Sequence, residues 1–342
     1  MASTTIANLW SPAIWIKSAD EVVRTFPSLI NSGGVTRSPF FDEIASGAGT
    51  IANLPFFKDL SDTVEGVQAE LTAPSLNNHS SATQLAPILN REVAFGAGAL
   101  TSAVTGQDVV ADITRQLGIS RQKRMQVTLV NVLRGLFGFS NLAGSPALNA
   151  TRYVVGSETG ASPSNGQLLT SSTFNTASSL LGELMSNASK GALWLHPAVH
   201  AGLLNQDSLN FTYQKVSDQP YMLSFYKGIP IYLSNLLSRA GTTSGTVYDS
   251  YLIAPGAVAL GMKPQVGDQV DAASLQYYPR PDLNDEQIYD RTRYMIHVMG
   301  TAFTGTPAGQ SASNTELATS GNWALRFSTA DRCGVVQIVT NG

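Results

Sequence analysis

Two histidines stand four residues apart in the segment His196-Pro197-Ala198-Val199-His200. On a helix this spacing places both imidazoles on one face, as in helices that bind zinc. A metalloprotease helix also needs a glutamate directly after the first histidine as general base, and this chain has Pro197 there. Because proline favours the first turn of a helix, we expect the helix to begin at Pro197 and His196 to cap it. We therefore predict no metal site here.

The other residues that could carry chemistry form no familiar catalytic motif. The sequence has no Gly-x-Ser-x-Gly elbow, no phosphate-binding loop ending in Gly-Lys-Ser/Thr and no Gly-x-Gly-x-x-Gly fingerprint. Acidic residues gather at Asp282, Asp285, Glu286 and Asp290. Their spacing lacks the glycine hinge of a calcium loop, so we interpret this stretch as a solvated loop. No catalytic residue, no cofactor and no enzymatic activity is predicted.

The composition favours a globular protein with few surface charges. The chain has 342 residues, of which 43% are hydrophobic and 13% are charged, and its formal net charge is −3. A core can be filled, and a weakly charged surface costs little to desolvate when copies of a chain associate. Ordinary secretion is the alternative explanation. The small negative charge argues against a protein whose main task is to grip phosphates.

The cysteine count and the hydropathy pattern indicate the cellular compartment in which the chain folds. Cys333 is the single cysteine, so it has no partner for an internal disulfide. The first residues lack the basic region and long apolar run of a secretory signal, and we expect the N-terminus to be retained and the chain to fold in the cytosol. The most apolar stretch, 127–139, is interrupted by Arg134, so no membrane span is predicted.

The N-terminal residues 1–47 are predicted to form an extended arm. They mix apolar side chains, including Trp10 and Trp15, with glycines and a proline, which is too broken a pattern for one domain core. Such side chains must be buried against something, either a neighbouring subunit or the body of the same chain.

Residues 48–101 are predicted to form a long two-stranded excursion. Two strand-like runs, 50–57 and 91–100, lie on either side of a polar segment. Because an isolated two-stranded ribbon is marginal in water, we expect this hairpin to need a partner. An ordinary meander within a sheet is the alternative.

Residues 106–137 carry apolar side chains mostly at three- and four-residue spacings, which predicts one long amphipathic helix. Acidic residues stand in its first turns and basic ones, including Arg121 and Arg124, in its later half, the order that the helix dipole favours. Gly118 leaves open whether the helix is continuous, bent or split. The arginines are interpreted as a solvated or interfacial face, with DNA contact as the alternative.

The rest of the chain alternates between helical and strand-like patterns, which predicts a mixed α/β region followed by long strands. The expected elements are a helix at 173–186, a strand at 192–195, a helix at 197–204, strands at 228–233 and 248–253, and a small-residue segment at 256–261. Two period-two segments, 288–303 and 323–339, are interpreted as paired strands separated by a low-complexity loop at 305–321.

A series of segments along nearly the whole chain follows an order found in a known family. The segments are Asn53–Leu60, Arg91–Phe95, Gly106–Val110, Ala192–Leu203, Tyr226–Tyr232, Tyr248–Gly261, Arg291–Gly300, Asn322–Leu325 and Val335–Gly342. In this order they resemble the major capsid proteins of tailed bacteriophages, which have the Hong Kong 97-type fold. Relatives often carry an acidic pair where this chain has Leu233-Ser234-Asn235, so no cation-linked role is expected for that loop.

The resemblance implies an α+β subunit with the Hong Kong 97-type phage capsid fold. Its implied parts are an N-terminal arm at 1–47, an extended β-hairpin loop at 48–101, a peripheral domain with the long spine helix at 102–145, an axial domain at 146–266, and peripheral-domain strands with the C-terminus at 267–342.

The resemblance also implies a function without catalysis. Copies of the chain would form the hexamers and pentamers of an icosahedral virion shell, made in the host bacterial cytoplasm and enclosing double-stranded DNA without sequence-specific binding. Portal, scaffolding and decoration proteins are further implied partners, and a membrane is not. Candidate subunit-interface residues are Trp10, Trp15, Phe56, Phe57, Asn77, Asn78, Arg121 and Arg124. The alternatives are the shell protein of an encapsulin-like bacterial compartment, a secreted ligand-binding protein or a hydrolase.

Overall fold

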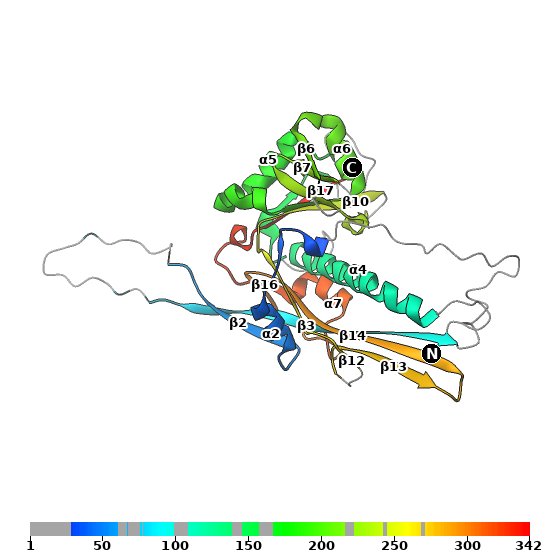
Figure 1. Ribbon diagram of the computed structural model, residues 1–342. Coiled ribbons are helices and arrows are strands. Elements are labelled where there is room, and N and C mark those ends of the chain that lie inside the picture. The colour runs from blue at the N-terminus through cyan, green and yellow to red at the C-terminus, as the bar shows by residue number, and fades with distance from the viewer. Residues whose placement is uncertain are drawn as a thin grey trace, which may run out of the picture.

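The structure is a computed structural model that describes residues 29–60, 67, 76, 78–98, 109–138, 146–156, 167–215, 222–241, 245–267 and 271–342. Its helices are α2 (Pro39–Ser46), α4 (Val109–Phe137), α5 (Ser171–Ser179), α6 (Pro197–Gln206) and α7 (Asn314–Ala318). Figure 1 shows a lobe built on one sheet and its helices above an elongated sheet, with α4 lying between the two. None of the described helices is long and apolar enough to cross a membrane.

Among the described residues, the elongated sheet has seven strands. β1, β11, β14, β13 and β12 follow one another in space, β3 also pairs with β14, and β2 pairs with β3. The strands are β1 (Val35–Arg37), β2 (Ile51–Phe57), β3 (Ser81–Gly98), β11 (Val258–Met262), β12 (Val266–Gly267), β13 (Ser274–Arg280) and β14 (Asp285–Val298).

β3 changes its strand partner at Pro87. Residues 81–87 pair antiparallel with β2, and residues 88–98 pair antiparallel with β14. The expected two strands are therefore present. However, the predicted run from residue 91 onward pairs with β14 rather than with β2, and the strand that does return along β2 begins at Ser81. We call residues 51–57 and 81–87 the β2–β3 ribbon, which projects from the body of the molecule in Figure 1.

In the described part of the chain, the second large sheet has eight strands in the spatial order β4, β17, β10, β5, β8, β7, β6, with β9 beside β10. They are β4 (Arg152–Val154), β5 (Ala192–Leu195), β6 (Phe211–Lys215), β7 (Met222–Tyr226), β8 (Ile229–Leu233), β9 (Ser238–Ala240), β10 (Thr246–Ile253) and β17 (Val335–Thr340). The strands predicted at 192–195, 228–233 and 248–253 are all present, and the helix predicted at 197–204 is α6. The helix predicted at 173–186 ends earlier, because α5 stops at Ser179 and a 3-10 helix spans 182–190.

Two strands lie in a different sheet from the one expected. β11 overlaps the small-residue segment 256–261 assigned to the axial domain, yet it pairs with β14 in the seven-stranded sheet. β17 was assigned to the peripheral domain, yet it pairs with β10 and β4 in the eight-stranded sheet. The chain crosses between the sheets directly after Ile253, so a linear division of the sequence cannot reproduce their membership.

The segment 323–339 is not one long strand. β16 (Trp323–Leu325) pairs with β15 (Thr301–Phe303) in a small separate sheet, whereas β17 joins β10. Between them Gly334 adopts φ +70° after a 3-10 turn, a left-handed conformation that ends the extended pattern. A Cβ at Gly334 would also lie 3.1 Å from the Cβ of Ala254.

The low-complexity segment 305–321 contains a helix instead of being loop throughout. α7 begins after Ser313, whose hydroxyl accepts a hydrogen bond from the Glu316 amide at 3.2 Å, while the Glu316 carboxylate accepts one from the Ser313 amide at 2.7 Å. This reciprocal capping box satisfies two amides that have no partner within the helix.

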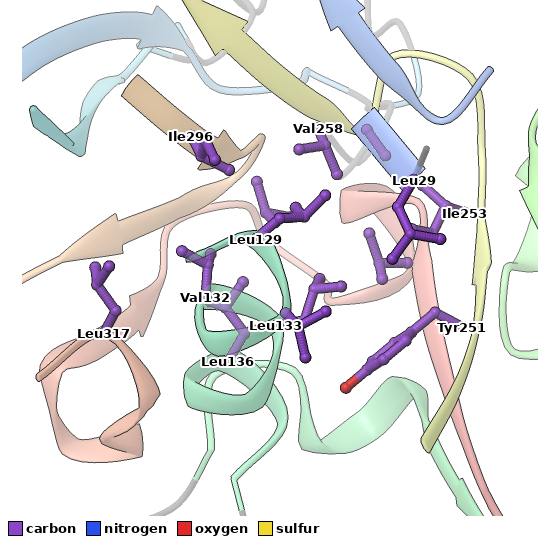
Figure 2. Packing of buried hydrophobic residues seen from close by; sticks show 14 of the residues in the cluster. Leu29, Leu129, Val132, Leu133, Leu136, Tyr251, Ile253, Val258, Ile296 and Leu317 are labelled. Carbon is purple, nitrogen blue, oxygen red and sulfur yellow. The ribbon is translucent and has the colours of Figure 1, made fainter. Parts of the chain in front are cut away.

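α4 is one continuous helix of 29 residues, passing through Gly118 without a break, and is about 43 Å long. The apolar residues of its C-terminal half are buried in a cluster that includes α7, β10, β11 and β14. Figure 2 shows Leu129, Val132, Leu133 and Leu136 pointing into this cluster. Gly135 permits close packing, because a Cβ there would collide with the Leu317 carbonyl oxygen and the Trp323 indole.

Candidate assembly surfaces

The two adjacent phenylalanines of β2 have different surroundings. Phe56 is half-buried, and its ring meets Phe327 edge to face with centroids 5.3 Å apart. Phe57 is 73% exposed and stacks on His79 at 4.8 Å. Successive side chains of a strand point to opposite faces, so one ring anchors the ribbon to the body and the other is presented outward.

A cavity of about 370 Å³ lies where the ribbon leaves the body. Its lining includes the residues Phe56, Phe57 and Phe327, together with Asp59 and Arg332, which form an ion pair at 2.8 Å. Both partners of this pair are partly exposed, so it contributes little to stability. The cavity therefore brings apolar residues and a partly exposed ion pair together beside the ribbon.

The middle of the ribbon is held by a buried polar contact. Gln84 of β3 accepts hydrogen bonds from the Gly300 amide at 2.9 Å and from Nε2 of His297 at 3.1 Å. Because that oxygen is an acceptor, Nε2 carries the proton, and Nδ1 is left as a buried acceptor without a partner among the described residues. Burial lowers the pKa of His297 to about 4, so the imidazole is neutral at pH 7.

The two candidate arginines of α4 face the same chain. Arg121 and Arg124 contact the two carboxylate oxygens of Asp290 at 2.8 and 2.6 Å, and Gln265 donates to the same carboxylate at 3.0 Å. Burial alone would raise the pKa of Asp290, but these three hydrogen bonds outweigh it and hold the pKa below its usual range. Their role between subunits stays a prediction.

The acidic stretch is a solvated turn only at Asp282, which is exposed, whereas Asp285, Glu286 and Asp290 lie on β14. Asp285 and Asp290 lie on β14 with their side chains buried, and Arg280 lies 3.5 Å from Asp285. These carboxylates can be buried because arginines from α4 and β13 pair with them. The spacing of the acidic residues along the sequence does not indicate these partners.

Of the remaining candidates, Trp10, Trp15 and Asn77 lie outside the described residues. Asn78 is exposed beside the stacked pair of Phe57 and His79. The structure thus places Phe56 and Phe57 in the ribbon and Asn78 a few residues before the start of β3, whereas the two arginines lie on α4.

The histidine pair that suggests zinc has a structural role. His196 is the N-cap of α6, and its Nδ1 accepts a hydrogen bond from the Ala198 amide at 3.1 Å, as the sequence predicts. His200 packs against Phe211, and burial lowers the pKa of both histidines. No group of three or more His, Cys, Asp or Glu side chains that could hold a metal ion is found among the residues that the structure describes.

Sequence reasoning missed a serine–lysine pair in the upper lobe. The Lys227 ammonium donates to Ser171 Oγ at 2.7 Å, a distance at which a neutral lysine can activate a serine. Here it also donates to Asn175 at 2.7 Å and lies over the rings of Phe174 and Tyr226. These partners engage the ammonium in structural contacts that join the β7–β8 turn to α5.

The same lysine occupies a strained backbone position. Lys227 has φ +50° in the turn to Gly228, where asparagine or glycine is the usual residue. The contacts of the Lys227 ammonium with α5 hold the β7–β8 turn in place, which explains why a lysine occupies this position. A Lys-Gly pair between two strand-like runs is the sequence signal for the turn, but not for the contact with α5.

Comparison with known proteins gives matches at the level of structure. No family model and no curated protein matches the sequence. The capsid of Ralstonia phage GP4 matches with a TM-score of 0.63 at 11% sequence identity, over 99% of this chain and 98% of that chain. The cyanophage Pam1 capsid gives 0.60 at 13% identity over 99% of both chains, and the cyanophage P-SCSP1u capsid 0.55 at 13% identity over 98% and 94%. The chain has the α+β fold of these phage capsid structures.

Proposed function

We propose that this chain is the major capsid protein of a tailed bacteriophage, whose copies form the hexamers and pentamers of an icosahedral shell around double-stranded DNA. The observation that carries the proposal is the end-to-end likeness to phage capsid structures, which covers 98% or more of both chains in two cases. No large part of the chain is left over for a different task.

The β2–β3 ribbon supports the proposal on physical grounds. The ribbon is fixed to the body through Phe56 and Gln84, but at its outer end Phe57 is 73% exposed and leaves apolar surface uncovered. A neighbouring copy would bury this surface. With 13% charged residues, like-charge repulsion between copies is small.

The further partners follow from the same function. We infer a location in the virion capsid after synthesis in the host cytoplasm, with portal and scaffolding or decoration proteins as additional partners. DNA would be confined rather than gripped, in keeping with the net charge of −3. No enzymatic activity is proposed, because Lys227, beside Ser171, is already engaged by Asn175 and two aromatic rings in fastening a turn.

The test is assembly of the purified full-length chain, followed by sizing chromatography and negative-stain electron microscopy. We expect shells, tubes or capsomer rings. A sharp monomer peak without particles, across protein concentration, salt and crowding agents, would contradict the proposal. Nuclease-protected DNA in particles from cells would support a virus shell, whereas enclosed enzyme would indicate an encapsulin-like compartment instead.

A further inference from the structure

β6 forms an outer edge of the eight-stranded sheet. It pairs antiparallel with β7, which is its strand partner among the described residues. β7 in turn pairs with β8 only through Phe225↔Pro230 and Tyr226↔Ile229, so the outer half of the β6–β7 hairpin stands off the sheet. Figure 1 places this hairpin in the upper lobe, away from the β2–β3 ribbon.

The hydrogen-bond pattern identifies the backbone groups that face outward. The Lys227 amide donates to the Asn210 carbonyl at 3.1 Å, so these two opposed residues form a hydrogen-bonded pair of the antiparallel ladder. This pair determines which residues of β6 bond to β7. Bonds toward the partner strand occur at alternate residues, so Thr212 and Gln214 face β7. The amide and carbonyl groups of Tyr213 and Lys215 then point away from β7, and no strand in the described part of the chain takes them up.

This edge lacks the proline that two strands of the other sheet carry. β2 contains Pro55 and β13 contains Pro279, and proline on an outer strand blocks the addition of a further strand. β6 has the sequence Phe-Thr-Tyr-Gln-Lys, with no proline and with its one charge at the end. Apolar surface accompanies it, since Leu209 is 96% and Tyr213 51% exposed.

We propose that the outer edge of β6 receives an extended strand from a second copy of this chain, which continues the eight-stranded sheet across a subunit boundary. The proposal rests on the proposed shell function. In a closed shell of identical subunits, each copy presents this edge to an equivalent position on a neighbouring copy. An unprotected edge strand is therefore placed against another copy of the same chain. The near-absence of charge on β6 and the low charge of the whole chain suit contact between identical copies.

The first test is hydrogen exchange of the full-length chain before and after assembly. The amides of Tyr213 and Lys215 should exchange at least about tenfold more slowly in particles, whereas those of Thr212 and Gln214 are already protected in the free chain. Particles in which Tyr213 and Lys215 exchange as fast as in the free chain would overturn this proposal and leave the shell function standing. A chain that stays monomeric under all conditions would overturn both.

A pair of variants gives a second, independent test. Tyr213→Pro removes an outward amide and keeps the bonds toward β7, and Tyr213→Thr removes the same ring but keeps the amide. We expect particle yield to fall roughly tenfold for Tyr213→Pro and to stay within about twofold for Tyr213→Thr. Thermal unfolding of the unassembled variants checks that both are folded. Equal yields from Tyr213→Pro and the parent chain would refute the proposal.

Discussion

The C-terminal half of α4 and the β2–β3 ribbon bury their apolar side chains to very different extents. Leu129, Leu133 and Leu136 are inaccessible within a cluster drawn from distant parts of the same chain (Figure 2). In the ribbon Leu54 is buried at the middle of β2, but Phe57 at the outer end remains 73% exposed.

The difference separates two sources of stability. The cluster around α4 is complete within one chain, so it sets the free energy of unfolding of an unassembled subunit. In the proposed shell the ribbon would gain its remaining burial from a neighbour, and its contribution would then depend on the assembled state. Substitutions in the two regions should therefore change different measurable quantities.

Leu133→Ala tests the core side of this comparison and should have the largest effect. Leu133 is fully buried in the cluster, so the truncation leaves a cavity and should lower the free energy of unfolding by about 3–5 kcal/mol. Urea unfolding of unassembled subunits measures it. The control is Ile119→Ala on the more exposed half of α4, where the cost should be below about 1 kcal/mol. Equal effects from both would mean that the two halves of α4 do not differ as described.

His297 tests the junction where the ribbon meets the core. Burial lowers its pKa from 6.5 to about 4, so the unfolded chain binds more protons between these values. Stability should be fully present above about pH 6.5 and fall by about 3 kcal/mol as the pH drops to 4. His297→Gln should remove this part of the pH dependence, measured by urea unfolding at each pH. His196 and His200, whose pKa values burial also lowers, add a remainder of the same sign. A variant as acid-sensitive as the parent chain would contradict the assignment.

Asp290→Asn tests whether α4 is fastened to β14 from within the chain. The variant leaves Arg121 and Arg124 without their carboxylate, and because both arginines are partly exposed the expected loss is about 2 kcal/mol at pH 7. Asp112→Asn is the matched control, since Asp112 pairs with Arg115 on the exposed surface of the same helix and should cost below about 1 kcal/mol. If Asp290→Asn instead left subunit stability unchanged and abolished assembly, the arginines would act mainly between subunits.

Local patterns in the sequence predicted local structure well. The 3.6-residue periodicity located α4, and Pro197 placed the start of α6 and the cap at His196. The Ser313 to Glu316 spacing was a capping-box signal for α7 that the low-complexity composition around it concealed. These features depend on residues within one or two turns of each other.

Pairing between distant segments could not be predicted in the same way. Period-two patterns indicate a strand but not its neighbour, so the switch of β3 at Pro87 and the pairing of β17 with β10 were missed. Asp290 was interpreted as solvated because its arginines lie on α4, far away in the sequence. The order of the segments along the chain nevertheless indicated the capsid fold. A resemblance to a family identifies the fold as a whole, even where the partner of an individual strand is not predicted.

Phe57→Ala is the variant with the smallest expected effect on subunit stability and the one that tests the ribbon side. Because the ring is mostly exposed, the free energy of unfolding of the unassembled chain should change by less than about 0.5 kcal/mol, while particle yield falls severalfold. Leu54→Ala, on the same strand but buried, should instead destabilise the free subunit by about 2 kcal/mol or more. Sizing chromatography and urea unfolding on the same samples separate the two outcomes. Normal assembly of Phe57→Ala would mean that no neighbouring copy covers the exposed face of the ribbon. The cluster around α4 and the ribbon would then differ in how far their side chains are buried, and not in their dependence on assembly.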